Sequence, residues 1–505
     1  MLDFIDGWLE KITMYRLMLY YLLGLLVIAL IESQSGFLNY SPIALVLYSF
    51  MFVAICWSAN KVFAYVLKAP TNSESSLITG LILALIVSPI NSKSSIIFAV
   101  LVAIVAMASK YIIAINKKHI FNPAAFGVVS VGLIVNQAAT WWVGNPKMLP
   151  FVLIGGILIT RKIRRERMVT IFIITSLVAT TLFTYLTGGD VNLFLQRTVL
   201  SFPLFFMAFV MLTEPLTSPT SKRGQNWYAI LAGALFPPQV HLASIYSTPQ
   251  LDLMVSNAFA YLSSPRIKLF LKLESKKKLS TNITNFSFVP DQPIAYLPGQ
   301  FMEWTLPHKE YDARGDRRYF TLSSSPSEKK LMIGVRFNES GSSYKKTLEA
   351  LKEGGAISAS QLGGDFVMPS DQAVKLMFIA GGVGITPFRS MIKYLLDRNE
   401  KRDIVVMYFA NNPESFVYKD VLSKARKQLG IKTIYVVSDK NIKYWTGRKG
   451  SISVQLIQDS IPDYQQRTFY ISGPQTMVKH TKSLLKDELE ISRKQIKTDF
   501  FSGYS

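Results

Sequence analysis

The segment with the clearest chemical potential is a glycine-rich turn, Ala380-Gly-Gly-Val-Gly-Ile-Thr-Pro387, between an apolar run and a predicted helix. Glycines let a backbone approach a pyrophosphate closely, and the amides at a helix N-terminus attract its negative charge. Tight packing of the helix on the strand explains many such turns equally well. The candidate nucleotide contacts in this turn are Gly381, Gly382, Gly384, Thr386 and Pro387.

A second segment carries the groups that a flavin requires. Arg318-Tyr-Phe-Thr-Leu-Ser-Ser-Ser325 supplies a guanidinium for phosphate, an aromatic ring for the isoalloxazine and hydroxyls on alternate residues. A polar edge strand without a ligand is the alternative. Downstream, Gly341-Ser-Ser-Tyr344 precedes an amphipathic helix and forms a second possible phosphate cradle.

A third motif, Ser472-Gly-Pro-Gln-Thr-Met477, follows a predicted strand and opens a helix. Since the carboxyl ends of parallel strands share one edge of a sheet, we expect this turn beside the glycine-rich turn, where nucleotides bind. Ala410-Asn-Asn-Pro-Glu414 follows another strand, with no Lys or Arg before Lys419 to pair with a 2′-phosphate. This arrangement favours NADH over NADPH.

The elements that carry these motifs follow two patterns. Short β-like runs at 284–289, 300–306, 318–323 and 331–337 predict a small antiparallel barrel. From residue 375 strands alternate with helices, which predicts a parallel, doubly wound α/β sheet. The predicted strands are 376–379, 404–409, 432–437 and 468–471, and the predicted helices are 386–396, 419–429, 454–457 and 474–489.

In this order the three motifs closely resemble the ferredoxin–NADP reductase superfamily over residues 265–505. The resemblance implies an FAD-binding β-barrel at 265–370 and an NAD(P)-binding domain at 371–505. Arg318 would bind the flavin pyrophosphate, Phe320 would lie against the ring, and Thr321 would face N5. The other implied flavin contacts are Ser323, Ser324, Val335, Arg336, Gly341, Ser342 and Ser343.

The resemblance also implies contacts to the nicotinamide nucleotide. Ser472, Gly473 and Pro474 would lie near the nicotinamide, although family members often have cysteine where Ser472 stands. Asn411 and Met477 complete the expected nucleotide contacts. The chain end, Asp499-Phe-Phe-Ser-Gly-Tyr504, resembles the terminal aromatic segment that guards the flavin face. Phe501 is the first candidate for that ring and Tyr504 the second; Thr321, Ser472 and Phe501 are the candidate catalytic residues.

Composition separates these motifs from the first half of the chain. The 505 residues are 50% hydrophobic and 17% charged, with a mean hydropathy of +0.26. Residues 1–265 contain 17 basic and 9 acidic residues, and the remainder contains 38 and 24. The composition therefore predicts that the first half is embedded in a membrane and that the second half is soluble.

Several chemistries are excluded by residue counts. The single cysteine, Cys56, rules out a disulfide framework, a thiolate zinc site and an iron–sulfur cluster ligated by this chain alone. The net charge of +22 is scattered, without the aromatic and basic platform of a nucleic-acid binder. A haem-bearing reductase needs paired axial histidines, whereas the first half has only His119 and His241, predicted at opposite membrane borders. No metal site is expected.

Ten apolar runs within residues 1–264 predict eight to ten membrane-spanning helices. Lys and Arg concentrate in alternate connections, above all at 161–167, which places both termini and the soluble half in the cytoplasm. The basic segment 266–278 suits contact with anionic headgroups as the chain leaves the bilayer.

Two polar motifs interrupt the apolar half: Phe121-Asn-Pro-Ala-Ala-Phe-Gly127 and Thr213-Glu-Pro-Leu-Thr-Ser-Pro219. Helix capping is the plain interpretation, but Glu74 and Glu214 lie near membrane borders, where ionisable groups suggest function. The order of these segments resembles the RnfD and NqrB membrane subunits of the Rnf and Nqr redox complexes over residues 15–260. The resemblance implies a ten-helix flavin-binding domain. The candidate flavin contacts are Asn122, Thr213, Glu214, Thr217 and Ser218.

One departure from that family concerns flavin attachment. Its members join FMN to a threonine in a Ser-Gly-Ala-Thr motif, but this chain has Asn136-Gln-Ala-Ala-Thr-Trp-Trp-Val-Gly-Asn-Pro-Lys147 there. A non-covalent FMN or riboflavin is therefore expected in place of a covalent one.

Together the halves predict a multi-pass oxidoreductase of the cell membrane. Electrons would pass from NADH or NADPH through FAD to a membrane flavin or a quinone, with an extracellular acceptor or a partner flavoprotein as further possibilities. The alternatives are a haem-free quinone reductase without transmembrane transfer and a transporter regulated by the flavoprotein.

Overall fold

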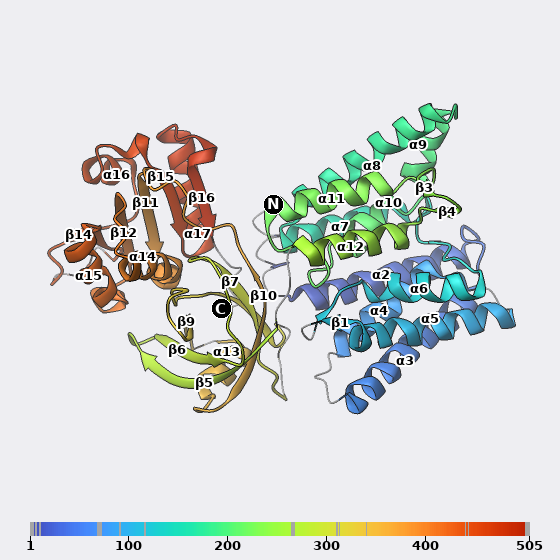
Figure 1. The fold of residues 1–505 in the computed structure, drawn as a ribbon, viewed down its shortest axis with the longest axis horizontal. Helices are drawn as coiled ribbons and strands as arrows, with labels where there is room; N and C mark the ends of the chain where they lie inside the picture. The colour runs from blue at the N-terminus through green and yellow to red at the C-terminus, as the bar shows by residue number, and fades with distance from the viewer. Residues whose placement is uncertain are drawn as a thin grey trace. The chain divides into compact units, whose positions relative to one another are not determined.

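The computed structural model describes the chain except for residues 1–4, 6–7, 10–11, 68–72, 90–91, 116–117, 264–267, 310–311, 313, 340, 440, 443 and 500–505. The chain forms two compact units, Met1–Ile267 and Lys268–Ser505 (Figure 1). The first is helical, and the second contains two six-stranded sheets.

Among the described residues, four helices of the first unit are long and apolar enough to cross a membrane. They are α2 (Met14–Gln34), α3 (Pro42–Val66), α5 (Lys93–Ile112) and α8 (Glu166–Leu186). A fifth candidate is the pair α9 (Val191–Leu200) and Leu204–Met211, which is bent by 53°. This pair contains α10 (Leu204–Phe206) and the π-helical turn η1 (Met207–Met211).

Five further helices coincide with predicted runs but are shorter than a span. They are α4 (Ser73–Ile86), α6 (Pro123–Val135), α7 (Leu149–Ile163), α11 (Lys222–Leu235) and α12 (Pro249–Ser263). Length and composition thus support four or five spans, and the larger number stays a prediction.

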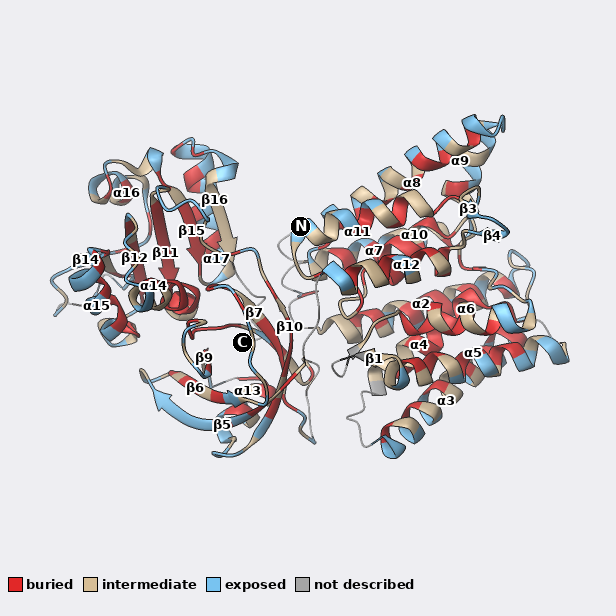
Figure 2. Cartoon of the chain, in the orientation of Figure 1, coloured by how far each residue is buried: buried red, intermediate tan, exposed pale blue. Residues whose placement is uncertain are grey.

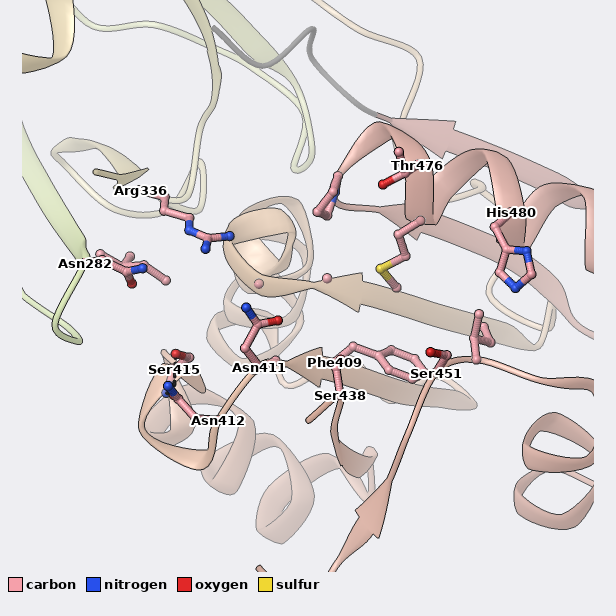
Figure 3. Close-up of a pocket in the computed structure, with 17 residues that line it drawn as sticks. Asn282, Arg336, Phe409, Asn411, Asn412, Ser415, Ser438, Ser451, Thr476 and His480 are labelled. Carbon is pink, nitrogen blue, oxygen red and sulfur yellow. Dashed lines mark hydrogen bonds between the residues drawn. The ribbon is translucent and has the colours of Figure 1, made fainter. Parts of the chain in front are cut away.

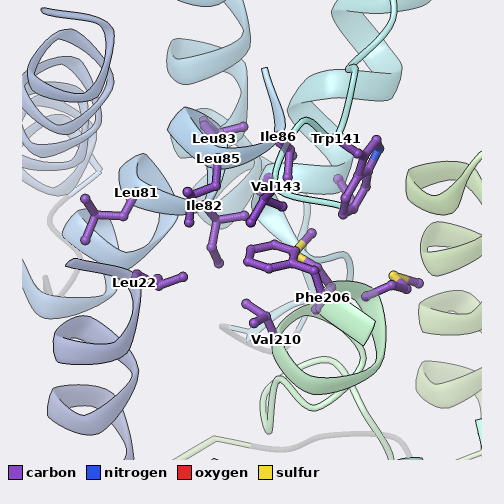
Figure 4. Close-up of a cluster of buried hydrophobic side chains, with 14 of the residues drawn as sticks. Leu22, Leu81, Ile82, Leu83, Leu85, Ile86, Trp141, Val143, Phe206 and Val210 are labelled. Atoms are coloured by element: carbon purple, nitrogen blue, oxygen red, sulfur yellow. The ribbon is translucent and has the colours of Figure 1, made fainter. Parts of the chain in front are cut away.

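The burial of α4 shows how a helix shorter than a span is accommodated in the helical unit. Residues 81–87, in α4 and just after it, are all buried (Figures 2 and 4). The carbonyls at its end are covered by the segment 136–147: the Trp141 amide donates to Ile86 O at 2.9 Å and the Trp142 indole donates to Ala84 O at 2.9 Å. A helix can end inside an apolar unit because its last carbonyls find donors there.

The outer helices present apolar side chains outward. Ile43 and Phe50 of α3 and Tyr185 of α8 are each more than 70% exposed. A protein surrounded by water seldom exposes such surfaces, whereas lipid tails favour them.

The barrel sheet of the second unit is antiparallel, with strand order β8-β7-β10-β5-β6-β9. Segment 269–278, expected from its lysines to lie against headgroups, forms the inner strand β5, because Leu269, Leu271 and Leu273 alternate into the core. The helix α13 (Ser343–Ala350) follows β9. The strands are β5 (Leu269–Lys278), β6 (Ile283–Pro290), β7 (Phe301–Thr305), β8 (Arg317–Thr321), β9 (Leu331–Arg336) and β10 (Ala356–Gly363).

The second sheet is parallel, with order β14-β13-β12-β11-β15-β16. The chain leaves β11 toward β12 on one side and returns to β15 on the other, which creates a switch point at the carboxyl ends of β11 and β15. The strands are β11 (Leu376–Gly381), β12 (Ile404–Ala410), β13 (Lys432–Val437), β14 (Arg448–Lys449), β15 (Thr468–Ser472) and β16 (Ile496–Asp499). The helices are α14 (Thr386–Arg398), α15 (Lys419–Leu429), α16 (Val454–Ser460) and α17 (Gln475–Ser483).

Candidate functional site

The two glycine turns meet at the switch point. A Cβ on Gly384 would lie 2.4 Å from Ser472 O, and one on Gly381 would lie 2.4 Å from Met477 Sδ. These two glycines therefore allow close packing of the turns. Gly382 differs, because its φ of +55° requires a left-handed backbone and the space beyond it is open. Of the three, Gly382 is the one suited to approach by a ligand.

A cavity of about 430 Å³ opens beside these turns. Figure 3 shows Arg336 and Asn411 extending toward it from the ends of β9 and β12. The predicted residues that line it are Arg336, Gly381, Gly382, Asn411, Pro474 and Met477. Thr386 and Pro387 are buried in the first turn of α14, where the Thr386 hydroxyl donates to Val383 O at 3.1 Å.

Sequence reasoning missed other lining residues. Asn412 and Ser438 follow the ends of β12 and β13, while Thr476 and His480 lie on α17. Asn412 and Ser438 could have been predicted because each follows the end of a parallel strand. Thr476 and His480 could have been predicted because they lie one turn apart on the helix after β15.

The phosphate-binding groups expected for a flavin gather beside α13. Arg318 is 4% exposed; its Nη1 donates to Arg314 O at 2.7 Å, and its guanidinium lies 5.0 Å from the centre of the Tyr344 ring. The Phe320 ring lies 6.1 Å from the Tyr344 ring. Burial, together with the nearby Arg318, Arg336 and Arg314, lowers the pKa of Lys345 to about 8. Such an excess of positive charge fits the diphosphate of FAD.

The Gly341-Ser-Ser turn begins α13. The Ser342 hydroxyl, which is fully buried, accepts from Lys345 N at 3.3 Å and caps the helix. The Ser343 amide donates to Asp312 Oδ2 at 3.0 Å. Burial alone would raise the pKa of Asp312, but hydrogen bonds from Arg314 and from the Ser343 amide outweigh it and hold the pKa at about 2.

Three groups converge where flavin and nicotinamide are expected to meet. The Thr321 hydroxyl lies 3.5 Å from Asp499 Oδ2, and Ser472 pairs with Asp499 across β15 and β16. Asp499 was missed as a site residue because 178 residues separate it from Thr321. Phe501 and Tyr504 lie outside the described residues.

The remaining predicted flavin residues lie at contacts between the barrel strands and the helical part of the α/β domain. Ser323 O accepts from Arg389 Nη1 at 2.9 Å, and Ser324 O accepts from the Ser390 hydroxyl at 2.5 Å. Val335 is buried in β9, next to Gly334, which contacts Tyr418. These residues thus fasten α14 and α15 to the barrel.

In the helical unit, Asn122, the N-cap of α6, contacts the loop that contains the other four candidate flavin residues. Glu214 Oε2 accepts from Asn122 Nδ2 at 3.0 Å and from the Thr217 hydroxyl at 2.8 Å. His119 Nε2 lies 3.6 Å from Glu214 Oε1. Arg165 binds the other side of the loop, donating to Thr213 O and to the Ser218 hydroxyl.

Two other predictions concern this unit. Glu74 pairs with Arg16 at 3.1 Å. Thr140 of the segment 136–147 forms a hydroxyl–hydroxyl contact of 2.6 Å with Ser88. His119 lies in the short strand Lys118–His119 and His241 in the exposed strand His241–Leu242, so the two histidines do not lie on facing helices as a bis-histidine haem requires.

Comparisons with known proteins match the two units separately. Residues 143–237 match the NQR2, RnfD, RnfE family, and residues 378–483 match the oxidoreductase NAD-binding domain. The chain is 28% identical over 210 residues to the glycine betaine monooxygenase reductase subunit of Pseudomonas aeruginosa, covering 41% of this chain and 57% of that protein. It is 27% identical over 239 residues to a flavohemoprotein of Bacillus cereus, covering 45% and 59%.

Solved structures with a similar arrangement include the ferredoxin reductase in carbazole 1,9a-dioxygenase, at 19% identity and a TM-score of 0.40, covering 47% of this chain and 70% of that one. Another is the ferredoxin–NADP+ reductase from Plasmodium falciparum, at 21% identity and a TM-score of 0.38, covering 46% and 97%.

The chain spans less than two thirds of the length of the curated relatives described above. The match to the oxidoreductase NAD-binding domain falls on the second unit, and the match to the NQR2, RnfD, RnfE family falls on the first. The chain therefore joins a region that matches the NQR2, RnfD, RnfE family, in its first unit, to a region that matches the oxidoreductase NAD-binding domain, in its second unit.

Proposed function

We propose that this protein is a membrane-bound oxidoreductase that passes electrons from cytoplasmic NAD(P)H through FAD to a flavin, a quinone or both in the membrane unit, and across the membrane. The observation that carries this proposal is the presence of both regions in one chain. FAD, when bound, supplies the conversion between a hydride donor and one-electron acceptors. With one cysteine the chain cannot ligate an iron–sulfur cluster by itself, so its own membrane unit is the natural acceptor.

The module's residues would hold the cofactors in distinct places. Arg318 and the start of α13 would bind the flavin phosphates, Phe320 would lie against the ring, and Thr321 with Ser472 and Asp499 would orient the reacting edge. The nicotinamide nucleotide would occupy the cavity beside Gly382.

The cavity lining also bears on the choice between NADH and NADPH. At the ends of β12 and β13 it consists of neutral groups: Asn411, Asn412, Ser415 and Ser438. The basic groups among the described lining residues are Arg336 on β9 and His480 on α17. A 2′-phosphate at these strand ends would find neutral partners, which favours NADH.

In the membrane unit, the loop around Glu214 would hold a non-covalent flavin, either FMN or riboflavin. Its support is the family match and the hydrogen bonds that Glu214 accepts from Asn122, at the start of α6, and from Thr217 in the same loop. The final acceptor would be a quinone, an extracellular carrier or a partner flavoprotein. The basic connections support a cytoplasmic module and cytoplasmic termini.

The proposal is tested by extracting the cofactors and by reconstituting the protein in liposomes with NADH outside and an impermeant acceptor inside. We expect FAD in the extract, a second flavin that is released on a denaturing gel, and reduction of the internal acceptor. Reduction of added quinone alone would instead support a quinone reductase without transmembrane transfer. Reduction of the flavin with neither acceptor reduced would support the transporter alternative. A Soret absorption band would indicate a haem-bearing reductase instead.

A further inference from the structure

The nucleotide cavity has one wall from the barrel and another from the parallel sheet. Asn282, Ile283 and Arg336, at neighbouring ends of β6 and β9, line it on the barrel side. Asn411 and Ser415, in the connection from β12 to α15, line it on the other side (Figure 3). The width of the cavity therefore depends on how closely the barrel approaches this connection and the glycine-rich turn.

The barrel contacts the connection through one pair of strand residues. Asn285 of β6 pairs with Gly334 of β9, two residues along from the pair of Ile283 and Arg336. Because residues two apart on a strand face the same side of a sheet, Asn285 lies on the same face as Ile283. Asn285 Oδ1 accepts from the Tyr418 hydroxyl at 2.8 Å, and both side chains are buried. The strand pair thus holds the start of α15 beside the cavity.

Gly334 makes this close approach possible. A Cβ at this position would lie 2.7 Å from the Tyr418 hydroxyl and 2.9 Å from Thr386 Cγ2. Thr386 begins α14, directly after the glycine-rich turn, and Tyr418 is the N-cap of α15. A larger residue at position 334 would push both helix starts away from the barrel, and the cavity would widen.

Tyr418 depends on the same contact to keep its backbone conformation. Its φ of +57° lies in the left-handed region, which a bulky residue adopts only where surrounding contacts hold it. The hydrogen bond to Asn285 is one such contact, and the Val417 amide donates to the Tyr408 hydroxyl at 3.2 Å. Loss of the Tyr418 hydroxyl would let the connection 411–417 relax toward an unstrained backbone.

We propose that Asn285, Gly334 and Tyr418 set the width of the cavity and thereby the affinity for the nicotinamide nucleotide. All three are positioning residues, since none of them is among the described residues that line the cavity. The inference rests on the proposed function, which places NADH in this cavity. The Ser323 hydroxyl donates to the same Asn285 Oδ1 at 3.3 Å. The contact therefore joins the flavin motif to the connection that lines the nucleotide cavity.

The test uses the full-length protein in detergent with FAD bound. Changes in flavin absorbance give the Kd for NAD+, and turnover with ferricyanide as electron acceptor gives kcat and the KM for NADH. Tyr418→Phe should raise both the Kd and the KM about tenfold, because it removes one buried hydrogen bond. It should leave kcat within about twofold of the wild-type value. An unchanged KM together with a lower unfolding temperature would mean that the bond is merely structural, and would overturn the inference.

Tyr470→Phe is the matched control. Tyr470 is a buried tyrosine whose hydroxyl donates to Val367 O at 2.7 Å, and it is not among the described residues that line the cavity. This variant should lose stability but keep the wild-type Kd for NAD+ and KM for NADH. An equal rise of the Kd in Tyr470→Phe and Tyr418→Phe would assign the effect to a general loosening of the fold and would overturn the inference.

Gly334→Ala tests the spacing directly. It should weaken NAD+ binding, because the two helix starts must move away from the barrel. In Tyr418→Phe the clashing oxygen is absent and the nearest ring carbon lies 3.7 Å from the added Cβ. Gly334→Ala should therefore weaken binding less in Tyr418→Phe than in the wild type. Equal effects in the two backgrounds would show that the residues do not act through one contact, against the inference.

The outcomes for the two proposals are distinct. Thermal unfolding and the amount of bound FAD show whether each variant is folded. A wild-type protein that neither binds NAD+ nor oxidises NADH would overturn the proposed function and this inference together. Normal wild-type binding with an unchanged Kd in both Tyr418→Phe and Gly334→Ala would overturn only the inference.

Discussion

Lys345 lies among three arginines, and this arrangement makes the charge of its ammonium group depend on pH near neutrality. Burial and those cations lower its pKa to about 8. A bound phosphate would stabilise the ammonium form and raise that pKa again. Protonation of Lys345 is therefore coupled to flavin binding.

We therefore predict that FAD affinity is highest below pH 8 and falls as pH rises through the pKa of Lys345 in the FAD-free protein. The sign follows because the bound form has the higher pKa, so binding takes up a proton above about pH 8. Fluorescence titrations from about pH 6.5 to about pH 9.5 measure this. Lys345→Met should lose the decline, and an equal decline in that variant would assign it to another group.

At the scale of elements, the two turns at the carboxyl edge of the parallel sheet depend on glycine for different reasons. Gly384 lies against the backbone of the β15–α17 turn, so a methyl group would displace Ser472 and Gly473. Gly382 faces open space but has a left-handed backbone. Gly384 therefore allows close packing of the two turns, whereas Gly382 allows a left-handed backbone and leaves the cavity open to a ligand.

Alanine substitutions should separate these roles. Gly384→Ala should lower the free energy of unfolding by about 3 kcal/mol, because backbone atoms rather than a flexible side chain must move. Gly382→Ala should cost only about 1–2 kcal/mol for the left-handed residue, yet weaken NADH binding, because its methyl group would enter the cavity.

Chemical denaturation followed by the fluorescence of the second unit measures the first effect, and titration with NADH measures the second. A larger loss of stability in Gly382→Ala than in Gly384→Ala would contradict this assignment.

At the scale of the whole molecule, charge is distributed unequally between two units of similar length. About one residue in ten is charged in residues 1–265 and about one in four afterwards. The basic residues of the first half concentrate in alternate connections, which orients a membrane protein. Four or five of the described helices reach span length, so the topology in the bilayer requires a direct measurement.

Cysteine labelling offers that measurement, because the only native cysteine, Cys56, is buried. With both termini cytoplasmic and ten spans, the start of α9 lies outside the cell. We expect Asn192→Cys, at an exposed position, to react with an impermeant maleimide on intact cells. Lys424→Cys, exposed on α15, should react only after the cells are permeabilised. The reverse pattern would invert the topology.

Much of the fold could be predicted from local patterns. Alternating apolar residues and glycine turns predicted β6, β7, β8, β9 and the strands β11, β12, β13 and β15. Strand β5 was not predicted, because lysines stand among its residues and obscure the alternation of Leu269, Leu271 and Leu273. The number of membrane spans was harder to predict from the sequence, because an apolar run of fewer than about 20 residues fits a buried helix as well as a span.

What the sequence determined by itself was the class of each half, the order of the motifs and the kinds of group available for flavin and nucleotide, because periodicity, turn chemistry and charge are local properties. Tertiary structure alone decided that Gly384 packs while Gly382 faces the cavity, and that Asp499 reaches Thr321. It also decided that Asp312 and Arg314 join the start of α13. The physical reason is that such contacts depend on strand order and crossover connections, which bring distant residues together without leaving a local pattern in the chain.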